Sequence, residues 1–489
     1  MAEEQNLERM QELVIEAKKA GDLIKSFSGR IRVISHYDCD GICSAAIISR
    51  TLAREGKEFH LTLVKQLNEN IVKDISQEKN RLILVLDMGS GQIDNIQKHI
   101  LSASGKAGPT VIIADHHQVQ CEIAGEFKGK IMHINPVLFG IDDNISGAGV
   151  SYLIARAMSS ANTDLSELAI VGAIGDSQIG AIGEDWGLLG INKEILKDAQ
   201  KINKIRVEKG LRLWGRYTRP LHKTLQYSVD PYIPGISDSE SGSVHFLQEL
   251  GIELKKPDGS WRTLADLSQE EQSRLATGII KERIRSNEEH PERIFGDVYS
   301  LADKKDELRD ANEFATILNA CGKNGAGHNG VSLCLNDFGA MQEVRQLLES
   351  YRRSIGKALS WLEKNKNTIR TTDAASYILA GSGISEHVIS NVTSIASRSG
   401  MLPEGRPVFA FVDAEDNMTK VSARAEDSVV KGGLDLKELV AGAVAETGGE
   451  GGGHSGAAGA TIPRGTEEKF INTMERLIKT ALSGQCSVG

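Results

Sequence analysis

Four segments of the sequence carry carboxylate and imidazole groups in patterns that suit divalent metal ions. They are His36-Tyr37-Asp38-Cys39-Asp40-Gly41, the single carboxylate of Asp87, Asp115-His116-His117, and Asp176 after Gly175. Oxygen-rich sites with some imidazole favour Mn²⁺ or Mg²⁺, whereas thiolates favour zinc. Together the segments supply enough ligands for two ions, and two neighbouring ions can hydrolyse a phosphate ester. The residues therefore predict phosphate-ester hydrolysis.

Each segment taken alone has a plainer structural interpretation. Asp38 and Asp40 can be caps of a helix that begins near Gly41, and Asp87 can be a turn residue at a strand end. The paired histidines are harder to explain in this way, because two buried imidazoles need polar partners. The occurrence of all four segments in one chain favours a metal site over these separate roles.

The elements that surround these segments explain how their side chains would meet. Short apolar runs alternate with helical patterns, which is typical of a parallel α/β sheet. Strands are predicted at residues 31–34, 82–86, 110–113 and 131–134, with a further strand at 59–64. Ligands of open parallel sheets bind beyond the carboxyl ends of the strands. The segments that follow these strands are therefore expected to converge on one cleft.

The length of 489 residues predicts two or three domains, because a single core stops growing well below that size. We predict an α/β fold with four parts. They are a parallel-sheet domain at 1–200, a mainly helical insert at 201–310, a connector at 311–370 with a long bridging helix, and a smaller α/β domain at 371–489.

Composition and charge limit the location and the partners. The 40% hydrophobic and 25% charged residues are ordinary for a soluble globular protein, and no apolar run has the length of a membrane span. The amino terminus does not resemble a signal peptide, so we expect a cytoplasmic protein without a membrane partner. The net charge of −9 argues against nucleic-acid binding by bulk electrostatics, although metal-binding carboxylates contribute to that sum.

Six cysteines lie at positions 39, 43, 121, 321, 334 and 486, with no C-x-x-C pair. This spacing argues against a disulfide framework and against a thiolate zinc site. We expect reduced and mostly buried thiols.

The ordered motifs H-x-D-x-D-G, strand-end D, D-H-H and G-D resemble those of the DHH phosphoesterases, and the resemblance covers nearly the whole chain. His133-Ile134-Asn135-Pro136 and Ser146-Gly147-Ala148-Gly149-Val150 are typical of the same domain. Gly451-Gly452-Gly453-His454 resembles the mark of the companion DHHA1 domain. The resemblance implies a catalytic cleft between the two outer domains.

The resemblance also implies roles for individual residues around two divalent ions, Mn²⁺ or alternatively Mg²⁺. The metal ligands would be His36 and Asp38 for one ion, Asp40, His116 and Asp176 for the other, and Asp87 as a bridge between them. The catalytic set would add His117, which would face the scissile phosphate, while Asp115 would orient a ligand histidine. Ser177 and Gln178 depart from the methionine often found in RecJ-like proteins, and we expect them to affect packing only.

Substrate contacts are expected in the last domain. Ser422 and Arg424 resemble the S-x-R element of the family, and arginine suits phosphate because its planar fork donates two hydrogen bonds. Gly452, Gly453 and His454 would let backbone N–H groups approach a phosphate. The plainer alternatives are a surface arginine and a flexible glycine loop.

A basic segment from Lys201 to Lys223 is a candidate path for a single strand. It carries eight cations against Glu208, with Trp214 and Tyr217 interleaved for base stacking. The alternative, weighed equally, is a solvated face whose tryptophan packs on the core.

The chain is most similar to the archaeal RecJ-like, GINS-associated nucleases, through its length, its insert, and the segments at 212–221 and 313–320. This resemblance implies a metal-dependent exonuclease in DNA replication or repair, acting 5′-to-3′ on single-stranded DNA, with RNA as a further substrate and GINS as a partner. The alternatives are a phosphodiesterase for very short RNA or cyclic dinucleotides, and a scaffold related to the replicative helicase. Because every metal ligand is present, activity is expected.

Overall fold

The computed structural model describes residues 2–78, 80–102, 108–141, 145–182, 185–228, 233–237, 239–286, 291–398, 401–403 and 405–483. The chain divides into two compact units, residues 1–344 and 345–489, with the boundary inside helix α13 (Met341–Lys364). Throughout the described ranges, no helix is both long and apolar enough to cross a membrane.

A five-stranded parallel sheet forms the centre of the first unit. Its strands lie side by side in the order β2 (Phe59–Val64), β1 (Ile31–His36), β3 (Leu82–Leu86), β4 (Thr110–Ala114) and β5 (Ile131–Ile134). The strands predicted from the apolar runs are confirmed. The three strands that lead into candidate ligands, β1, β3 and β4, are neighbours in the middle of the sheet. Their carboxyl ends therefore lie together.

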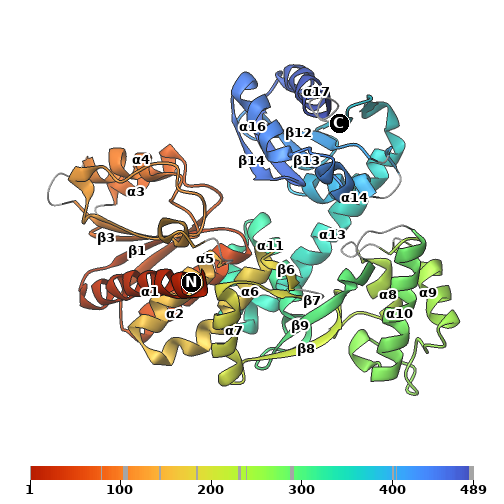
Figure 1. Ribbon diagram of the computed structural model, residues 1–489, viewed down its shortest axis with the longest axis horizontal. Coiled ribbons are helices and arrows are strands. Elements are labelled where there is room, and N and C mark those ends of the chain that lie inside the picture. The colour runs from red at the N-terminus through yellow and green to blue at the C-terminus, as the bar shows by residue number, and fades with distance from the viewer. Residues whose placement is uncertain are drawn as a thin grey trace. The chain divides into compact units, whose positions relative to one another are not determined.

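Helices cover both faces of this sheet, as Figure 1 shows. α1 (Ala2–Ser26), α2 (Cys39–Arg54) and α5 (Gly147–Met158) lie on one face, and α3 (Glu69–Gln77) and α4 (Ile93–Asn95) lie on the other. α1 is helical because its buried side chains, Leu13, Ala17, Ala20 and Ile24, recur at spacings of three and four. On the opposite face, Val72 and Ile75 of α3 pack with Ile83 and Val85 of β3. This burial on both sides holds the strand ends rigidly.

The rest of the first unit contains strands that the sequence did not reveal. α6 (Ser166–Gly175) leads into the hairpin of β6 (Ile179–Ile182) and β7 (Asp185–Leu188), and α7 (Ile191–Lys201) follows. β8 (Ile205–Leu211) then pairs antiparallel with β9 (Phe295–Leu301), although helical periodicity was predicted throughout 201–310. Pairing across some ninety residues is set by tertiary contact, which a local pattern does not report.

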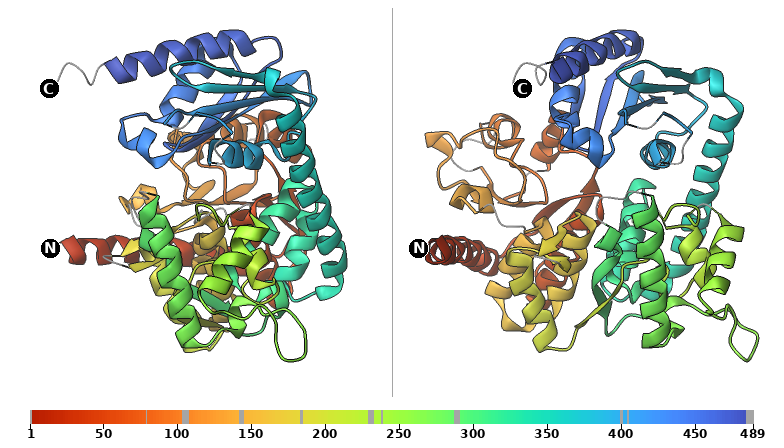
Figure 2. Two further views of the ribbon diagram at one scale, coloured as in Figure 1. Left: turned by 90° about the vertical axis from the view of Figure 1, so that its right-hand side faces the viewer. Right: turned by 45° about the vertical axis from the view of Figure 1, so that its right-hand side comes forward.

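The segment between β8 and β9 is helical, as expected. α8 (Leu221–Gln226), α9 (Glu240–Glu249) and α10 (Gln269–Arg285) share a buried cluster that includes Leu225, Leu247 and Ile279. Figure 2 shows these yellow-green to green helices grouped together. α11 (Ala311–Lys323) and α12 (Gly327–Cys334) complete the unit. The proposed division into four parts stays a prediction, since the structure separates only two units.

The second unit contains a six-stranded sheet in the order β10-β11-β12-β13-β15-β14. The bounds are β10 (Ile369–Thr371), β11 (Ser376–Gly381), β12 (Val408–Ala414), β13 (Met418–Arg424), β14 (Glu450–His454) and β15 (Ala457–Pro463). The helices are α14 (Ile389–Arg398), α15 (Asp427–Lys431), α16 (Leu436–Thr447) and α17 (Glu467–Ser483). The predicted α/β fold class, a parallel-sheet domain with a smaller α/β domain, is confirmed.

Four cysteines, Cys39, Cys43, Cys321 and Cys334, are buried free thiols, and Cys121 is a partly exposed one. Cys486 lies outside the described residues.

Candidate metal centre

The loop between β1 and α2 holds the first cluster. Asp38 is the N-cap of α2, and its Oδ1 accepts a hydrogen bond from the Gly41 N–H at 3.0 Å. A Cβ at Gly41 would lie 2.2 Å from the carbonyl oxygen of His36, so only glycine permits this tight loop. The capping role proposed for Asp38 is therefore real, but it uses one carboxylate oxygen. The other oxygen, Oδ2, lies 3.0 Å from Nδ1 of His36.

Asp87 lies directly after β3 in an unusual backbone conformation. Its φ is 55°, a left-handed conformation that aspartate adopts more readily than most residues, and its N–H donates to the Ala114 carbonyl at 2.8 Å. The side chain is buried. A Cβ at Gly147, in the first turn of α5, would lie 2.5 Å from Asp87 Oδ1. The glycine at the start of α5 thus leaves space for this carboxylate.

The segment after β4 arranges its two histidines differently. The buried carboxylate of Asp115 accepts hydrogen bonds from the N–H groups of Ser90 and His116, and its Oδ1 lies 2.7 Å from Nδ1 of His117. Asp115 therefore orients the ring of His117, which was expected to face the substrate. Its contact with His116, the expected metal ligand, is through the backbone.

Two clusters of three side chains meet at Asp87. In the first, Nδ1 of His36 lies 3.0 Å from Asp38 Oδ2 and 3.5 Å from Asp87 Oδ2. In the second, Nε2 of His116 lies 3.7 Å from an oxygen of Asp40 and 3.7 Å from an oxygen of Asp176. The two clusters are linked because the same His116 nitrogen lies 3.4 Å from Asp87 Oδ1. Each Asp87 oxygen thus faces one cluster.

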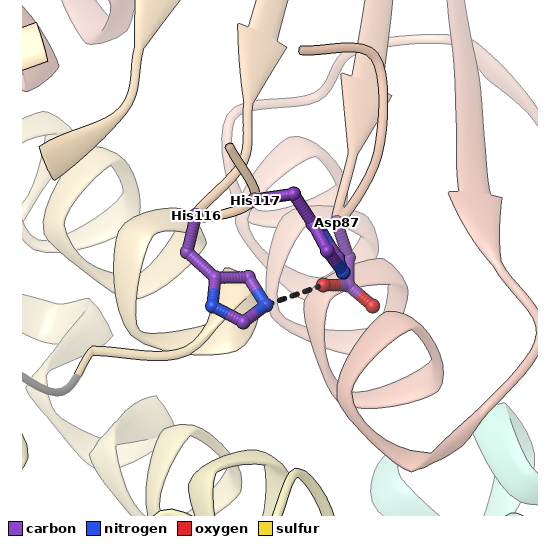
Figure 3. A group of neighbouring side chains, drawn as sticks. All are labelled: Asp87, His116 and His117. Atoms are coloured by element: carbon purple, nitrogen blue, oxygen red, sulfur yellow. Dashed lines mark ion pairs between the residues drawn. The ribbon is translucent and has the colours of Figure 1, made fainter. Parts of the chain in front are cut away.

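His117 also approaches this centre. Figure 3 shows its ring beside that of His116, near the Asp87 carboxylate. The side chains of Asp87, His116 and His117 place ligand atoms within 4.8 Å of one another. The His117 side chain is 56% exposed, whereas that of His116 is 14% exposed, so His117 is the histidine that a bound molecule can reach.

The remaining ligand candidates are held by helix ends. Asp40, in the first turn of α2, accepts hydrogen bonds from the N–H groups of Gly147 at 2.6 Å and Ala148 at 3.0 Å, at the start of α5. Asp176 is the C-cap of α6 and accepts a hydrogen bond from Gln178 at 2.8 Å. Gln178 in turn accepts one from Asn192. Gln178, a departure from the family pattern, thus supports Asp176.

Charge is strongly concentrated in this centre. Burial, reinforced by repulsion from Asp87 and Asp176, raises the pKa of Asp40 well above its usual range. Burial alone would lower the pKa of His36 and of His116, but the adjacent carboxylates outweigh it and raise these values to about 11 and about 10. Burial opposes ionisation of Asp87 too, yet its two imidazole neighbours hold its pKa well below its usual range. Carboxylates that repel one another in this way would be stabilised by a divalent cation.

The donor atoms fit metal ions. Three buried atoms of the centre, His36 Nδ1, Asp87 Oδ1 and His116 Nε2, have charged neighbours at 3.0 to 3.5 Å but form no hydrogen bond with the described residues. Buried polar atoms are normally satisfied, and an ion is one of the common explanations for an exception. The nitrogen and oxygen atoms present, without a thiolate, match Mn²⁺ or Mg²⁺.

Residues outside the predicted set hold the loops that carry the candidate ligands. Ser90 Oγ lies 2.8 Å from Nε2 of His133 and accepts a hydrogen bond from Asn135, which also donates to the His117 carbonyl. Asn319 of α11 accepts the Cys39 N–H at 2.9 Å. The motif His133-Ile134-Asn135-Pro136 indicated the first group. Asn319 lies in the segment 313–320 that carried the family resemblance, but no role was predicted for it.

The residues expected to contact substrate lie in the second unit on β13 and β14, the two strands that flank β15. The register pairs Ser422 of β13 with Gly459 of β15, and Gly459 with Gly452 of β14. These paired residues form one row across the three strands. Two residues further along the same face, Arg424 pairs with Ala457, and Ala457 with His454, to form a second row. Gly453 occupies the row between them, so the structure brings all five predicted residues onto one end of the sheet. The glycines form an edge strand, β14, and not the flexible loop that was the plainer alternative.

Two side chains in these rows have distinct environments. Ser422 is buried, and its Oγ has no hydrogen-bond partner among the described residues. The Arg424 guanidinium donates to Ser394 Oγ at 2.8 Å and to the Ala423 carbonyl at 2.8 Å. These contacts argue against the alternative of a free surface arginine. The cleft expected between the outer domains stays a prediction.

The basic segment at 201–223 is largely neutralised by carboxylates. Arg206 pairs with Glu208 at 2.8 Å, Lys209 with Asp297 at 2.9 Å, and Lys223 with Glu240 at 2.6 Å. The Arg219 guanidinium stacks on the Trp214 ring at 3.6 Å from its centroid. This arrangement favours the structural alternative over a continuous path for a single strand.

Comparisons with known proteins match residues in both units of the chain. Three family models match the chain: the DHH family N-terminal domain at 30–175, the DHH-CID domain at 213–294 and the DHHA1 domain at 375–480. The uncharacterized protein MJ0831 of Methanocaldococcus jannaschii is 31% identical over 481 residues, which are 96% of this chain and 98% of that protein. The single-stranded-DNA-specific exonuclease RecJ of Thermus thermophilus is 27% identical over 180 residues, 35% of this chain and 24% of that protein.

Two solved structures show the same fold. RecJ from Thermus thermophilus in complex with Mn²⁺ has a TM-score of 0.58 and 17% identity, over 95% of this chain and 55% of that chain. CDC45 from Entamoeba histolytica has a TM-score of 0.57 and 13% identity, over 97% of this chain and 98% of that chain. The present chain thus spans about half of the RecJ structure. At these identities the likeness establishes the fold alone.

Proposed function

Because the chain belongs to the RecJ-like group of the DHH/DHHA1 superfamily, we propose that it is a two-metal exonuclease that hydrolyses phosphodiester bonds of single-stranded nucleic acid. The observation that carries this proposal is the position of Asp87 between two groups of candidate ligands. Its two oxygens face the His36 and Asp38 cluster on one side and the His116 cluster on the other. A carboxylate placed in this way suits two adjacent ions.

The proposed ligands are His36 and Asp38 for one ion, Asp40, His116 and Asp176 for the other, and Asp87 for both. Two Mn²⁺ ions, or Mg²⁺ in their place, would activate a water molecule and neutralise the charge that develops on the phosphate. The backbone N–H groups of Gly147 and Ala148 fix both oxygens of Asp40, so that this ligand needs no rearrangement.

We assign to His117 the role of contacting the phosphate that is cleaved. Its ring is more exposed than that of His116, and Asp115 holds its Nδ1, which leaves Nε2 directed away from this carboxylate. Burial opposes protonation of His117, but the hydrogen bond to Asp115 outweighs it and raises the pKa of the imidazole. A protonated ring can donate to a phosphate oxygen. Ser422, Arg424, Gly452, Gly453 and His454 would bind neighbouring phosphates of the strand.

Single-stranded DNA cleaved 5′-to-3′, with RNA as a further substrate, is the preferred assignment. It is supported by the RecJ-like family and by the full set of ligands. A phosphodiesterase for very short RNA or cyclic dinucleotides is the second enzyme candidate. The large segment at 213–294 that matches the DHH-CID domain counts against it, because such enzymes are typically shorter.

A replication scaffold is the candidate from another class, and the likeness in fold to CDC45 is the observation that favours it. GINS binding and a role in DNA replication or repair belong to this proposal as additional properties. The intact ligand set distinguishes an active enzyme from a scaffold alone. A pull-down with the cognate GINS complex that recovers no GINS would remove that partner.

The test is digestion of single strands of 2 to about 40 nucleotides, DNA and RNA, each labelled separately at either end. Release of labelled mononucleotide first from the 5′ end, with long strands digested as well as short ones, is the expected result. Cleavage confined to di- and trinucleotides would favour the second enzyme candidate. A protein that binds metal but cleaves no strand of any length would be a scaffold.

A further inference from the structure

A recess beside the β8–β9 pair lies among residues that the metal centre does not use. It has a volume of about 450 Å³ and is lined by Glu208, Arg216, Tyr217, Lys256, Thr263, Ala265, Asp266, Gln272 and Arg309. This volume is within the range of small-molecule sites, which is about 300 to 1,000 Å³. The lining is mainly polar and includes three cations and two carboxylates.

The two carboxylates of the recess already have partners. Asp266 Oδ1 lies 2.8 Å from the Lys256 ammonium, and its Oδ2 accepts hydrogen bonds from the N–H and the hydroxyl of Thr263. Glu208 pairs with Arg206 at 2.8 Å. Lys256 is therefore neutralised within the recess, whereas its two arginines are not neutralised by these acids.

Arg216 is the most unusual of the lining residues. Only 5% of its surface is exposed, and its Nη1 has no hydrogen-bond partner among the described residues. Asp310 interacts electrostatically with Arg216, but its Oδ1 accepts hydrogen bonds from the N–H groups of Asn312 and Glu313. A buried guanidinium with an unused N–H group is costly, and a bound anion would satisfy it.

Arg309 supplies a second guanidinium from another segment. It is exposed and lies over the Tyr217 ring, with its central carbon 4.6 Å from the ring centroid. The ring is itself fixed, since the Tyr217 hydroxyl lies 2.7 Å from Ser300 Oγ. The cation–π contact orients the guanidinium and leaves its N–H groups for a ligand.

We propose that this recess binds a phosphate group, with Arg216 and Arg309 as its two arginine ligands. The planar forks of two arginines match the several oxygens of a phosphate better than those of a smaller or monovalent anion. The phosphate can come from a free source, such as inorganic phosphate or a mononucleotide, or from the backbone of a nucleic-acid strand. The proposal is independent of the metal chemistry, since none of these residues belongs to the metal centre.

The test is binding of radiolabelled inorganic phosphate to the full-length protein in the presence of chelator, by equilibrium dialysis. The starting protein carries Arg424→Gln, which removes the other arginine proposed to bind phosphate. Arg309→Gln is added in one sample, and Arg285→Gln, an exposed arginine of α10 that does not line the recess, is added in the control. We expect phosphate affinity to fall at least tenfold with Arg309→Gln and to stay unchanged with Arg285→Gln.

Arg216→Lys tests the buried ligand while retaining its charge, and its urea midpoint shows whether the protein still folds. A folded Arg216→Lys variant should also lose at least tenfold in phosphate affinity. Competition identifies the source: displacement by a mononucleotide indicates a free phosphate, and displacement only by oligothymidylate indicates a strand. Equal phosphate binding with and without Arg309, or binding of an acidic peptide but of no phosphate, would overturn the proposal.

Discussion

The side chains of the candidate metal centre have two proposed roles. Most would hold ions, and one, His117, would contact the substrate. Asp40, Asp87 and His116 are largely enclosed, whereas His117 is more than half exposed and is held by Asp115. The two roles are assigned from what each imidazole contacts. Metal binding and turnover, measured separately, can therefore distinguish them.

Replacing His117 by Gln should lower turnover without removing an ion. The amide can still donate a hydrogen bond but lacks the positive charge of the protonated ring, so stabilisation of the charge that develops on the phosphate is lost and kcat should fall by about 10² or more. Bound manganese, measured by elemental analysis after gel filtration, should remain at the wild-type ratio. Loss of one equivalent of manganese from His117→Gln would instead make His117 a ligand and contradict its assigned role.

Helix ends and strand ends position these side chains. Asp87 ends β3, Asp40 opens α2, and the first turn of α5 approaches both of them. The close approach depends on the absence of a side chain at Gly147. The geometry of the centre is therefore sensitive to a single methyl group on a neighbouring helix.

Gly147→Ala should weaken metal binding although position 147 supplies no ligand side chain. Its Cβ would lie 2.5 Å from Asp87 Oδ1 and 2.7 Å from Asp87 Cβ, so Asp87 must move or α5 must shift. We expect manganese affinity to fall at least tenfold in a calorimetric titration. Gly356→Ala is the control, because a Cβ there meets nothing within 4 Å. Wild-type affinity in Gly147→Ala would mean that the centre is more adaptable than its contacts indicate.

The start of α11 adds a pH-dependent contribution to the stability of the first unit. Burial, with a smaller contribution from Asp310, raises the pKa of Glu313 from 4.5 to about 8, and its Oε1 accepts the Gly215 N–H at 2.9 Å. Because the folded pKa lies above the ordinary value, this stabilisation is complete below pH 4.5. It is lost as the pH rises through 8.

Glu313→Gln should remove most of that loss, because the amide does not ionise. Between pH 5 and pH 8.5 the wild-type free energy of unfolding should fall by a few kcal/mol more than that of the variant, an order-of-magnitude figure. Urea unfolding followed by tryptophan fluorescence reports mainly this unit, which contains three of the four tryptophans, Trp186, Trp214 and Trp261. Glu253→Gln, at an exposed position, is the control. Parallel pH curves for wild type and Glu313→Gln would refute the assignment.

The middle strands of the central sheet, β1, β3 and β4, could be predicted from the sequence because they are buried on both faces and therefore have continuous apolar runs. β8 could not, because Ile205–Leu211 carries charged residues and is defined by its partner β9, far away in the chain. β14 was not predicted as a strand, since its glycines lack side chains that indicate one. The histidine and aspartate motifs pointed to the centre, but the contact of Asp115 with the His117 ring depends on side-chain geometry.

The whole molecule contains the candidate metal centre in the first unit and the proposed phosphate contacts in the second. Arg424 and His454 occupy one row of the second sheet, and Ser422 and Gly452 occupy the next. The strand proposed as substrate would contact the second unit through phosphates other than the one that is cleaved. The two sets of residues should therefore affect different kinetic constants.

Arg424→Gln should raise KM for a long single strand about tenfold or more, with the bound manganese unchanged. The loss of two charge-assisted hydrogen bonds affects binding of neighbouring phosphates and not the ligands of the ions. Steady-state digestion of an end-labelled strand measures this. Arg370→Gln, which removes an exposed arginine paired with Glu468, is the control and should behave as wild type. A variant that lost metal while KM stayed constant would contradict the division of labour.

The central claim is that Asp87 joins two ions whose presence makes the protein a nuclease. The most direct test titrates metal-free protein with Mn²⁺ and follows bound ion and cleavage of single-stranded DNA in the same samples, for wild type and Asp87→Asn. Asparagine has the same shape and tolerates the left-handed backbone at this position. We predict two ions per wild-type chain, cleavage that appears as the second ion binds, and loss of both properties in the variant. Two ions bound without cleavage, or undiminished cleavage by Asp87→Asn, would contradict it.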